Sequence, residues 1–315
     1  MRSRVRERKG ERAARRFCAG AAALFLGFLL LSCGARRSAA PAPGDGTAAS
    51  AGVDGGEPRL AATSMSIVEI CDKLDLPLVG VPESNQFTLP ERYQGLRRVG
   101  APMSPDPEIL ADLAPDYVLS PLTLRQDLQE KYEKIGVKYL FLNLKSVPSM
   151  YKSVEEMGTL FHREQEAEQL LTEFRQFYQR FRQSHIGKEG PSVLILMGLP
   201  GAYVIATENS YCGSLVELAG GRNVYSGTDK DFLNGNTEDM LKRDPDVILR
   251  TAHAMPEEVM QMFDQEFREN DIWRHFRAVK ENRVYDLPSE CFGMSAKFNY
   301  QEAEAYLDTI FYGGE

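Results

Sequence analysis

Short runs of apolar residues alternate along the chain with segments whose apolar positions recur every three or four residues. Runs such as 78–81, 117–120, 192–197 and 247–250 have the length of buried strands, and the periodic segments between them have helical spacing. Alternation of this kind is typical of α/β domains with largely parallel sheets. The sequence therefore predicts an α/β fold.

A polar-rich segment over residues 163–185 separates two halves of this pattern. Its apolar residues repeat at helical spacing, which predicts a helix about 33 Å long. Ala-Pro-Asp-Tyr-Val-Leu at 114–119 and Asp-Pro-Asp-Val-Ile-Leu at 244–249 each connect a short helix to a strand, which indicates two related lobes. We expect two Rossmann-like lobes joined by one long rigid α-helix. The alternative is one larger α/β domain with this helix packed on a sheet.

The first 57 residues differ in composition from the rest. Eight basic residues within 2–16 precede an apolar run over 17–31, which is the pattern of a secretory signal and is too short to span a bilayer comfortably. The run ends in Leu-Leu-Ser-Cys-Gly, which resembles a bacterial lipobox in which Cys33 is lipidated. The predicted order is a lipoprotein signal peptide (1–32), a flexible tether (33–57), an N-terminal lobe (58–150), a linker that includes the helix (151–188) and a C-terminal lobe (189–315).

Net charge, the absence of certain motifs and the cysteine positions exclude several classes of protein. The chain carries 37 basic and 45 acidic residues, and because residues 1–32 hold 8 basic and 2 acidic ones, the remainder has a net charge of −14. Such a chain is not expected to bind nucleic acid or anionic lipid by charge. It has no GxxxxGK[ST] loop and no recognisable catalytic motif, so we do not expect an enzyme. Cys212 and Cys291 lie in the same half of the chain and could pair, but the sequence does not fix the distance between them.

Histidine is scarce, and one of the four is placed to bind a ligand. His253 directly follows a buried strand, at the edge where clefts form in open α/β sheets. For His162 and His185, at the ends of the long helix, we expect solvated positions, and for His275 a packing role. Met103 lies in a stiff loop, between Pro102 and Ser104-Pro105.

One thioether and one imidazole would suit the two axial faces of a haem iron. Met255 competes with Met103 but is two residues from His253, so one loop would have to reach both faces of the macrocycle. A ferric siderophore or cobalamin receptor needs neither ligand, and it remains the alternative. A zinc or manganese receptor would need three or four ligands, and a haem-degrading or hydrolytic enzyme would need a catalytic arrangement that no motif indicates.

A ligand with carboxylates needs an anion site, and a helix N-terminus offers one. The helix predicted after Thr63-Ser64 would present the N–H groups of Met65 and Ser66, with Ser84 and Asn85 nearby. This arrangement uses no basic side chain; the alternative is an ordinary helix cap without a ligand. Apolar cover for a porphyrin is expected from Leu199, Tyr203, Phe292 and Met294.

Residues 72–80, 191–207 and 246–287, together with the lipobox and the two-lobe pattern, resemble a known family. The chain resembles the substrate-binding lipoproteins of siderophore, cobalamin and haem ABC importers. It is most similar to the haem-receptor lipoproteins of the iron-regulated surface determinant system of Gram-positive bacteria, from residue 59 to about 312. The sequence departs from that family near 83–87, where one residue is inserted and Asn85 stands where the family can have Tyr.

The resemblance implies roles for particular residues. Met103, in a Gly-x-Pro-Met context, and His253, before x-Met-Pro-Glu-Glu, would ligate one haem b per chain. Glu108 and Glu238 would pair with arginines of an ABC permease that works with its ATPase. The chain would be a monomeric receptor, lipid-anchored on the extracellular face of the cell membrane, with surface haem-transfer proteins as upstream donors.

Overall fold

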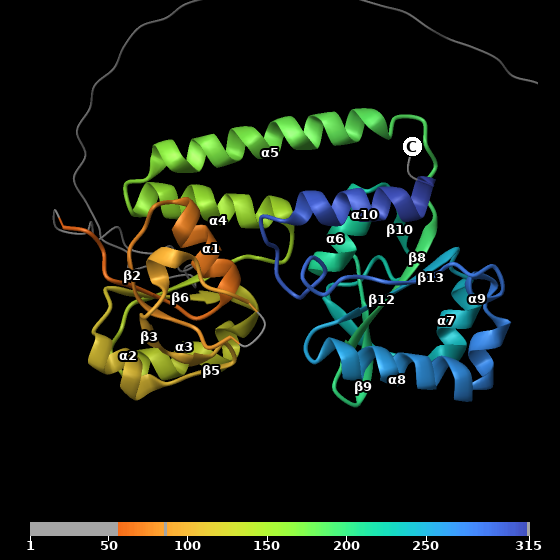
Figure 1. Cartoon of the computed structure of the whole chain (residues 1–315), viewed down its shortest axis with the longest axis horizontal. Helices are drawn as coiled ribbons and strands as arrows, with labels where there is room; N and C mark the ends of the chain where they lie inside the picture. The colour runs from red at the N-terminus through yellow and green to blue at the C-terminus, as the bar shows by residue number, and fades with distance from the viewer. Residues whose placement is uncertain (1–55, 85–86, 314–315) are drawn as a thin grey trace, which may run out of the picture. The chain divides into compact units, whose positions relative to one another are not determined.

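The computed structural model describes residues 56–84 and 87–313, which belong to one unit comprising residues 50–315 (Figure 1). The predicted signal peptide, Cys33 and most of the predicted tether lie outside the described residues, as does Asn85. Among the helices of the described part, none combines the length and the apolar character needed to cross a membrane.

The first lobe contains a five-stranded parallel sheet with the order β3-β2-β1-β6-β7. Its strands are β1 (Leu60–Ala62), β2 (Leu78–Val81), β3 (Arg97–Arg98), β6 (Tyr117–Pro121) and β7 (Tyr139–Leu142). The α-helices that connect and flank them are α1 (Met65–Lys73), α2 (Pro107–Leu113), α3 (Arg125–Lys134) and α4 (Val147–Leu160), with single 3₁₀ turns at Glu91–Tyr93 and Leu122–Leu124. A small hairpin, β4 (Gly100–Ala101) and β5 (Ser104–Pro105), lies off this sheet.

The second lobe contains a six-stranded mixed sheet in which β11-β9-β8-β12-β13 lie in that order and β10 pairs with β8. Its strands are β8 (Ser192–Leu199), β9 (Ala202–Ala206), β10 (Arg222–Asn223), β11 (Phe232–Asn234), β12 (Val247–Ala252) and β13 (Val284–Asp286). Its helices are α6 (Tyr211–Leu218), α7 (Thr237–Arg243), α8 (Pro256–Glu269), α9 (Arg277–Lys280) and α10 (Tyr300–Tyr312), with a 3₁₀ segment at Asp271–His275. Strands β8, β10, β12 and β13 are parallel, whereas β9 pairs antiparallel with β8 and β11. The predicted α/β class with largely parallel sheets is confirmed.

The internal repeat has a common structure in the two lobes. Helices α2 and α7 both end at a residue in the left-handed conformation, Ala114 (φ 44°) and Asp244 (φ 43°), just before the Pro-Asp pair. In each lobe the aspartate of this pair accepts a hydrogen bond from the start of the neighbouring strand. Asp116 Oδ2 accepts from the backbone N–H of Arg59, just before β1, at 2.8 Å, and Asp246 Oδ2 accepts from that of Ser192, the first residue of β8, at 2.7 Å. In each lobe, therefore, the same short sequence joins a helix to a strand and holds the turn between them against the start of a central strand.

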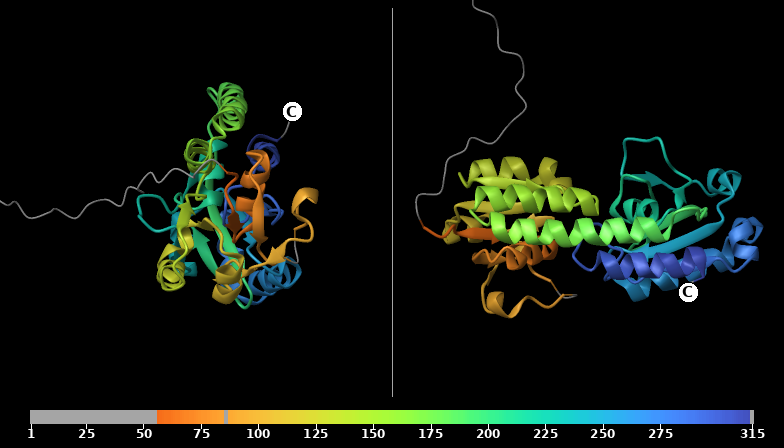
Figure 2. Two further views of the ribbon diagram at one scale, coloured as in Figure 1. Left: turned by 90° about the vertical axis from the view of Figure 1, so that its left-hand side faces the viewer. Right: turned by 90° about the horizontal axis from the view of Figure 1, so that it is seen from above.

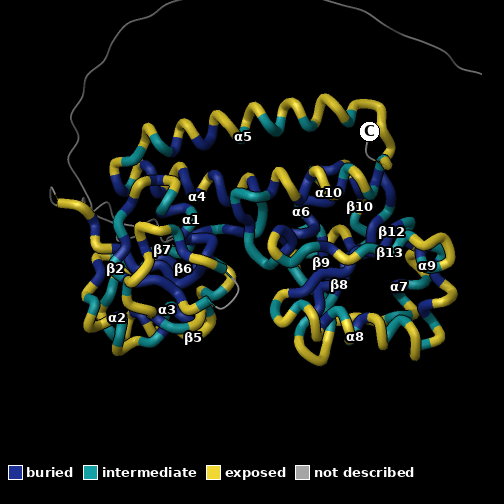
Figure 3. Tube along the Cα trace, viewed as in Figure 1, coloured by how far each residue is buried: buried dark blue, intermediate teal, exposed yellow. Residues whose placement is uncertain are grey.

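Helix α5 (Glu164–Ser184), at the position of the helix predicted over 163–185, runs along α4 and α10 (Figures 1 and 2). Tyr151 of α4 stacks on Phe174 of α5 with ring centroids 4.4 Å apart, and Tyr300 of α10 meets Phe177 of α5 edge-on at 5.3 Å. One continuous cluster of buried side chains includes residues of both sheets and of these three helices. Much of α5 is exposed along its outer side (Figure 3). The two lobes therefore share a core under this helical layer.

Two expectations about histidines are wrong, because His275, expected to pack, is exposed, and His185, expected to be solvated, is not. His185 is partly buried, with a side chain 10% exposed: its Nε2 lies 2.7 Å from an Asp308 carboxylate oxygen and its ring packs on Phe181 and Tyr312. Cys212 and Cys291, whose pairing the sequence left open, are both free and buried. Cys212 instead directs its thiol toward the backbone carbonyls of residues 292 and 293, which explains its place in the core.

Candidate functional site: the carboxyl ends of two sheets

Several of the predicted ligand-binding residues follow the carboxyl ends of strands. In the first lobe, Met65 comes after β1, Ser84 after β2, and the hairpin that carries Met103 after β3. These three strands are adjacent and parallel, so the residues that follow them lie at one edge of the sheet. His253 directly follows β12, a central strand of the second sheet. Ligand-binding crevices in open α/β sheets form at such edges.

Met103 lies at the tip of the β4–β5 hairpin, where Pro102 and Met103 form the two-residue turn. Gly100 begins the hairpin with a φ of 95°, a left-handed conformation that glycine adopts without steric cost. Two backbone hydrogen bonds hold the hairpin to the lobe, from Glu83 N–H to Gly100 O at 2.9 Å and from Asp106 N–H to Val99 O at 2.8 Å. The Met103 side chain is 67% exposed, so a braced turn presents a thioether to solvent.

His253 is fixed through its backbone and open at its surface. Its N–H donates to Gly198 O at 3.0 Å, which continues the pairing of β12 with β8. The residue is exposed, yet burial by neighbouring atoms lowers the pKa of the imidazole. The neutral ring is the form that binds a metal, so this environment favours a metal ligand. Met255, the other methionine considered as an iron ligand, has a φ of 48° and is 48% exposed.

The N-terminus of α1 is an open cap. Ser64 occupies the N-cap position but makes no side-chain cap hydrogen bond, and its buried Oγ has no partner among the described residues. Met65 and Ser66 form the buried first turn, which contains no acidic residue. After the adjacent strand β2, Ser84 Oγ accepts from the N–H of Phe87 at 3.1 Å. Free N–H groups and a vacant cap hydroxyl together make this turn suitable for an anion.

The remaining predicted positions differ in how far their side chains are exposed to solvent. Glu108 and Glu238 are both exposed, each in the first turn of the helix that precedes a Pro-Asp pair. Phe292, predicted to cover a ligand, is fully buried and belongs to the core, so that expectation is wrong. Tyr203 packs on Phe263 and Trp273 of its own lobe. Leu199 and Met294 are partly buried.

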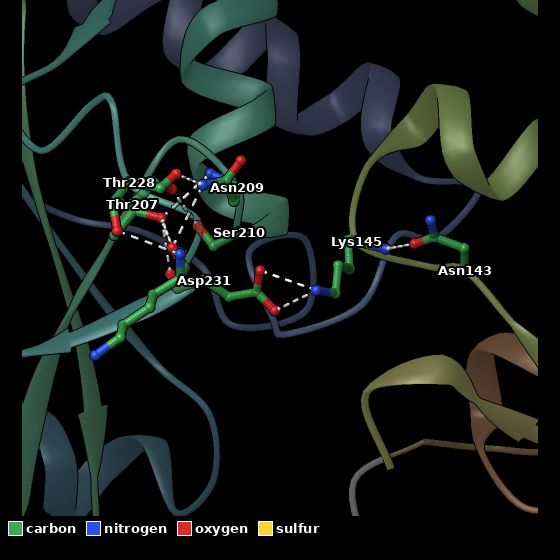
Figure 4. Close-up of polar contacts among 8 residues, drawn as sticks. Asn143, Lys145, Thr207, Asn209, Ser210, Thr228 and Asp231 are labelled. Atoms are coloured by element: carbon green, nitrogen blue, oxygen red, sulfur yellow. Dashed lines mark hydrogen bonds and ion pairs between the residues drawn. The ribbon is translucent and has the colours of Figure 1, made fainter. Parts of the chain in front are cut away.

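Two lysines that sequence analysis did not single out make contacts between the lobes. Lys145 forms an ion pair with Asp231 at 2.8 Å, and the backbone around Asp231 is held by Thr207, Asn209 and Thr228 (Figure 4). The other is Lys297, which lies on the segment before α10 and places its Nζ 3.6 Å from the centroid of the Phe87 ring. Neither contact follows a local sequence pattern, because each partner lies far away along the chain.

The fold and these strand-end positions define a two-lobed solute-binding protein. A family model described as "periplasmic binding protein" matches residues 60–291, and the chain belongs to that family. It is 42% identical over 258 residues to the "High-affinity heme uptake system protein IsdE" of Staphylococcus aureus, which covers 82% of this chain and 88% of the relative.

Solved structures agree with this assignment. The crystal structure of S. aureus IsdE complexed with heme has a TM-score of 0.78 at 42% identity and covers 82% of this chain and 100% of that one. An ABC transporter substrate-binding protein from Listeria monocytogenes EGD-e has the same TM-score and coverage at 45% identity. The vitamin B12 binding protein BtuF of Vibrio cholerae, at 17% identity and a TM-score of 0.65, shares the fold. The chain is therefore similar along almost all of its described length to substrate-binding proteins of ABC transporters.

Proposed function

We propose that this chain is a haem receptor, which binds one haem b per chain and delivers it to an ABC importer. The observation that carries the proposal is the pair of exposed potential iron ligands at the carboxyl edges of the two sheets, Met103 on a braced hairpin and His253 after β12. The 42% identity to a heme uptake protein supports the same ligand class. In this proposal the receptor is a monomer, and surface haem-transfer proteins supply the haem.

The two proposed ligands have complementary chemistry. His253 supplies a neutral imidazole nitrogen, and the lowered pKa of its ring keeps that nitrogen free of protons near neutral pH. Met103 supplies a soft thioether on the opposite face of the haem, which favours iron(II) more than a second imidazole would. The open N-terminus of α1, with Met65, Ser66, Ser84 and Asn85, receives the propionates.

The receptor meets its permease through two similar surface features. Glu108 and Glu238 are exposed at corresponding places in the repeated helix–Pro-Asp–strand unit, one on each lobe. In this proposal they pair with arginines of the permease, while lipidated Cys33 holds the receptor at the extracellular face of the cell membrane. Replacing both glutamates by Gln should leave haem binding intact and stop haem-dependent growth. A loss of haem binding would instead move them into the ligand site.

The test of the ligand assignment is a haemin titration of the purified protein, followed by visible spectroscopy. We expect a saturable one-to-one shift to a low-spin spectrum. His253→Ala should weaken binding and abolish that spectrum, whereas Met103→Ala should be milder and leave five-coordinate or water-ligated iron. Unchanged affinity and spectrum in both variants would refute the assignment. A featureless, non-saturating response of the wild type would refute the function and favour a ferric siderophore as ligand.

A further inference from the structure

Lys297 lies where the second lobe meets the first. It belongs to the segment between β13 and α10, and the preceding residue, Ala296, donates its N–H to Leu144 O of the first lobe at 2.8 Å. The ammonium itself lies over the ring of Phe87, also in the first lobe, 3.6 Å from its centroid. A side chain of the second lobe is thus placed against the loop that follows β2 in the first.

The Lys297 ammonium is buried without a close counter-ion. The residue is 8% exposed, and its Nζ donates to the backbone O of Glu290 at 3.2 Å. Among the described residues no carboxylate lies within 4.0 Å of it. Burial lowers the pKa of Lys297, and the attraction of Glu69 opposes that effect. Because an unpaired buried charge is costly, a site of this kind is completed by an anion or is under pressure to lose the charge.

The surroundings of Lys297 are those of the anion site at α1. The Phe87 ring beneath the ammonium belongs to a residue whose N–H donates to Ser84 Oγ, and Ser84 is one of the proposed propionate contacts. Glu69, which attracts Lys297, is the fifth residue of α1 and so lies about 6 Å along the axis from the first. The open cap at Ser64, with its buried and unpartnered Oγ, begins that same helix. Lys297 of the second lobe is therefore connected to the helix that carries this N-terminus through Glu69, and to Ser84 through Phe87.

We propose that Lys297 binds a carboxylate of the ligand and completes, from the second lobe, the anion site that the N-terminus of α1 and Ser84 form in the first. This inference rests on the proposed function, because haem carries two propionates. It also alters the expectation from sequence that the site uses no basic side chain. Binding would then link the lobes twice, through the iron and through a propionate.

Haemin and its dimethyl ester separate the two links, because the ester keeps the iron and lacks both carboxylates. The wild-type protein should bind haemin more tightly than the ester. Lys297→Met, which keeps the length of the chain over Phe87, should weaken haemin binding about tenfold or more and the ester little. The low-spin spectrum should be unchanged in this variant, because the iron ligands remain. Lys297→Arg should restore part of the preference for haemin.

Matched controls distinguish this role from a structural one. Lys145→Met removes another lysine that reaches the opposite lobe but already has a carboxylate partner, Asp231, so it should not change the preference for haemin over the ester. If Lys297 merely neutralises Glu69, Lys297→Met will lose thermal stability, Glu69→Gln will restore it, and both ligands will bind as to the wild type. That outcome would overturn the inference and leave the haem receptor intact. Failure of the wild type to bind either ligand would overturn the proposed function itself.

Discussion

Glu304 is a carboxyl group placed where a carboxylate would be costly. It is fully buried in α10, and neither of its oxygens has a hydrogen-bond partner among the described residues. Burial raises its pKa well above the ordinary value for glutamate. Tyr211, which interacts with it electrostatically, is also buried, and its pKa is raised well above 10, so it does not titrate near neutral pH. Glu304 is therefore held as the neutral acid.

This predicts a pH-dependent effect of Glu304→Gln. Above pH about 4.3 the unfolded chain releases the proton while the folded chain keeps it, so wild-type stability falls as pH rises toward the folded pKa. Glutamine is neutral throughout, so its advantage in thermal unfolding temperature over the wild type should grow between pH 5 and pH 8. Glu302→Gln, at an exposed position of the same helix, should show no such trend. A difference that stays constant with pH would contradict a neutral Glu304.

Single residues also show how far sequence analysis could reach. His253 and Met103 could be located at strand ends, because each lies within a few residues of an apolar run or a proline pair. Lys297 could not be assigned a role, because its burial depends on Phe87 in the other lobe. His185 was misplaced for the same reason: its partner, Asp308, belongs to the last helix.

The β4–β5 hairpin is the element on which the proposed methionine ligand depends. Gly100→Ala would place a Cβ 3.1 Å from Ser104 O and 3.2 Å from Asp106 N, in addition to the cost of a positive φ. We expect weaker haem binding and a changed iron spectrum, with a stability loss of about 1 kcal/mol.

Gly95→Ala is the matched control for this prediction. Gly95 has a similar φ of 84°, but a Cβ there would have nothing within 4 Å, and the residue precedes the hairpin. It should show a comparable loss in denaturant unfolding without a change in haem affinity or spectrum. Equal effects of the two substitutions on haem binding would show that hairpin geometry does not control the methionine.

Whole elements differed in how readily the sequence revealed them. The long helix and the helix–Pro-Asp–strand units stand out because their local pattern repeats. Helix α4 fell within the predicted lobe boundary and linker, although Val147, Met150, Tyr151 and Val154 have helical spacing and are buried. Strand β9 was not predicted, because five residues after a Pro-Gly turn carry little periodic signal and pair only with β8 and β11.

For the molecule as a whole, Lys145 and Asp231 form an ion pair between the lobes, with side chains 37% and 20% exposed. Partial burial and the clamped loop at Asp231 should make this pair more effective than a freely solvated one, with a coupling energy of about 1 kcal/mol in a double-mutant cycle of unfolding. The variants are Lys145→Ala, Asp231→Ala and both together. The exposed pair Lys134 and Glu130, within α3, should give a smaller coupling. Additive losses at Lys145 and Asp231 would mean that the pair contributes nothing.

The two-sheet α/β architecture could be predicted at this scale, because alternating strands and helices leave few other arrangements. The core that the two lobes share could not be predicted from the sequence. Apolar periodicity shows that α4, α5 and α10 each bury a face, but it does not show that these faces meet one another. The contacts among Tyr151, Phe174, Phe177 and Tyr300 join helices separated by most of the second lobe.

The position of α10 in that core has a consequence for how the protein is made. Chains emerge amino terminus first during synthesis, and their domains generally fold in that order. Helices α4 and α5 are complete long before α10, so their aromatic face stays uncovered until Tyr300–Tyr312 arrives. The aromatic contacts between the lobes are therefore completed only after α10 has been made. Until α10 is in place, the nascent chain exposes this apolar face to proteases and to aggregation.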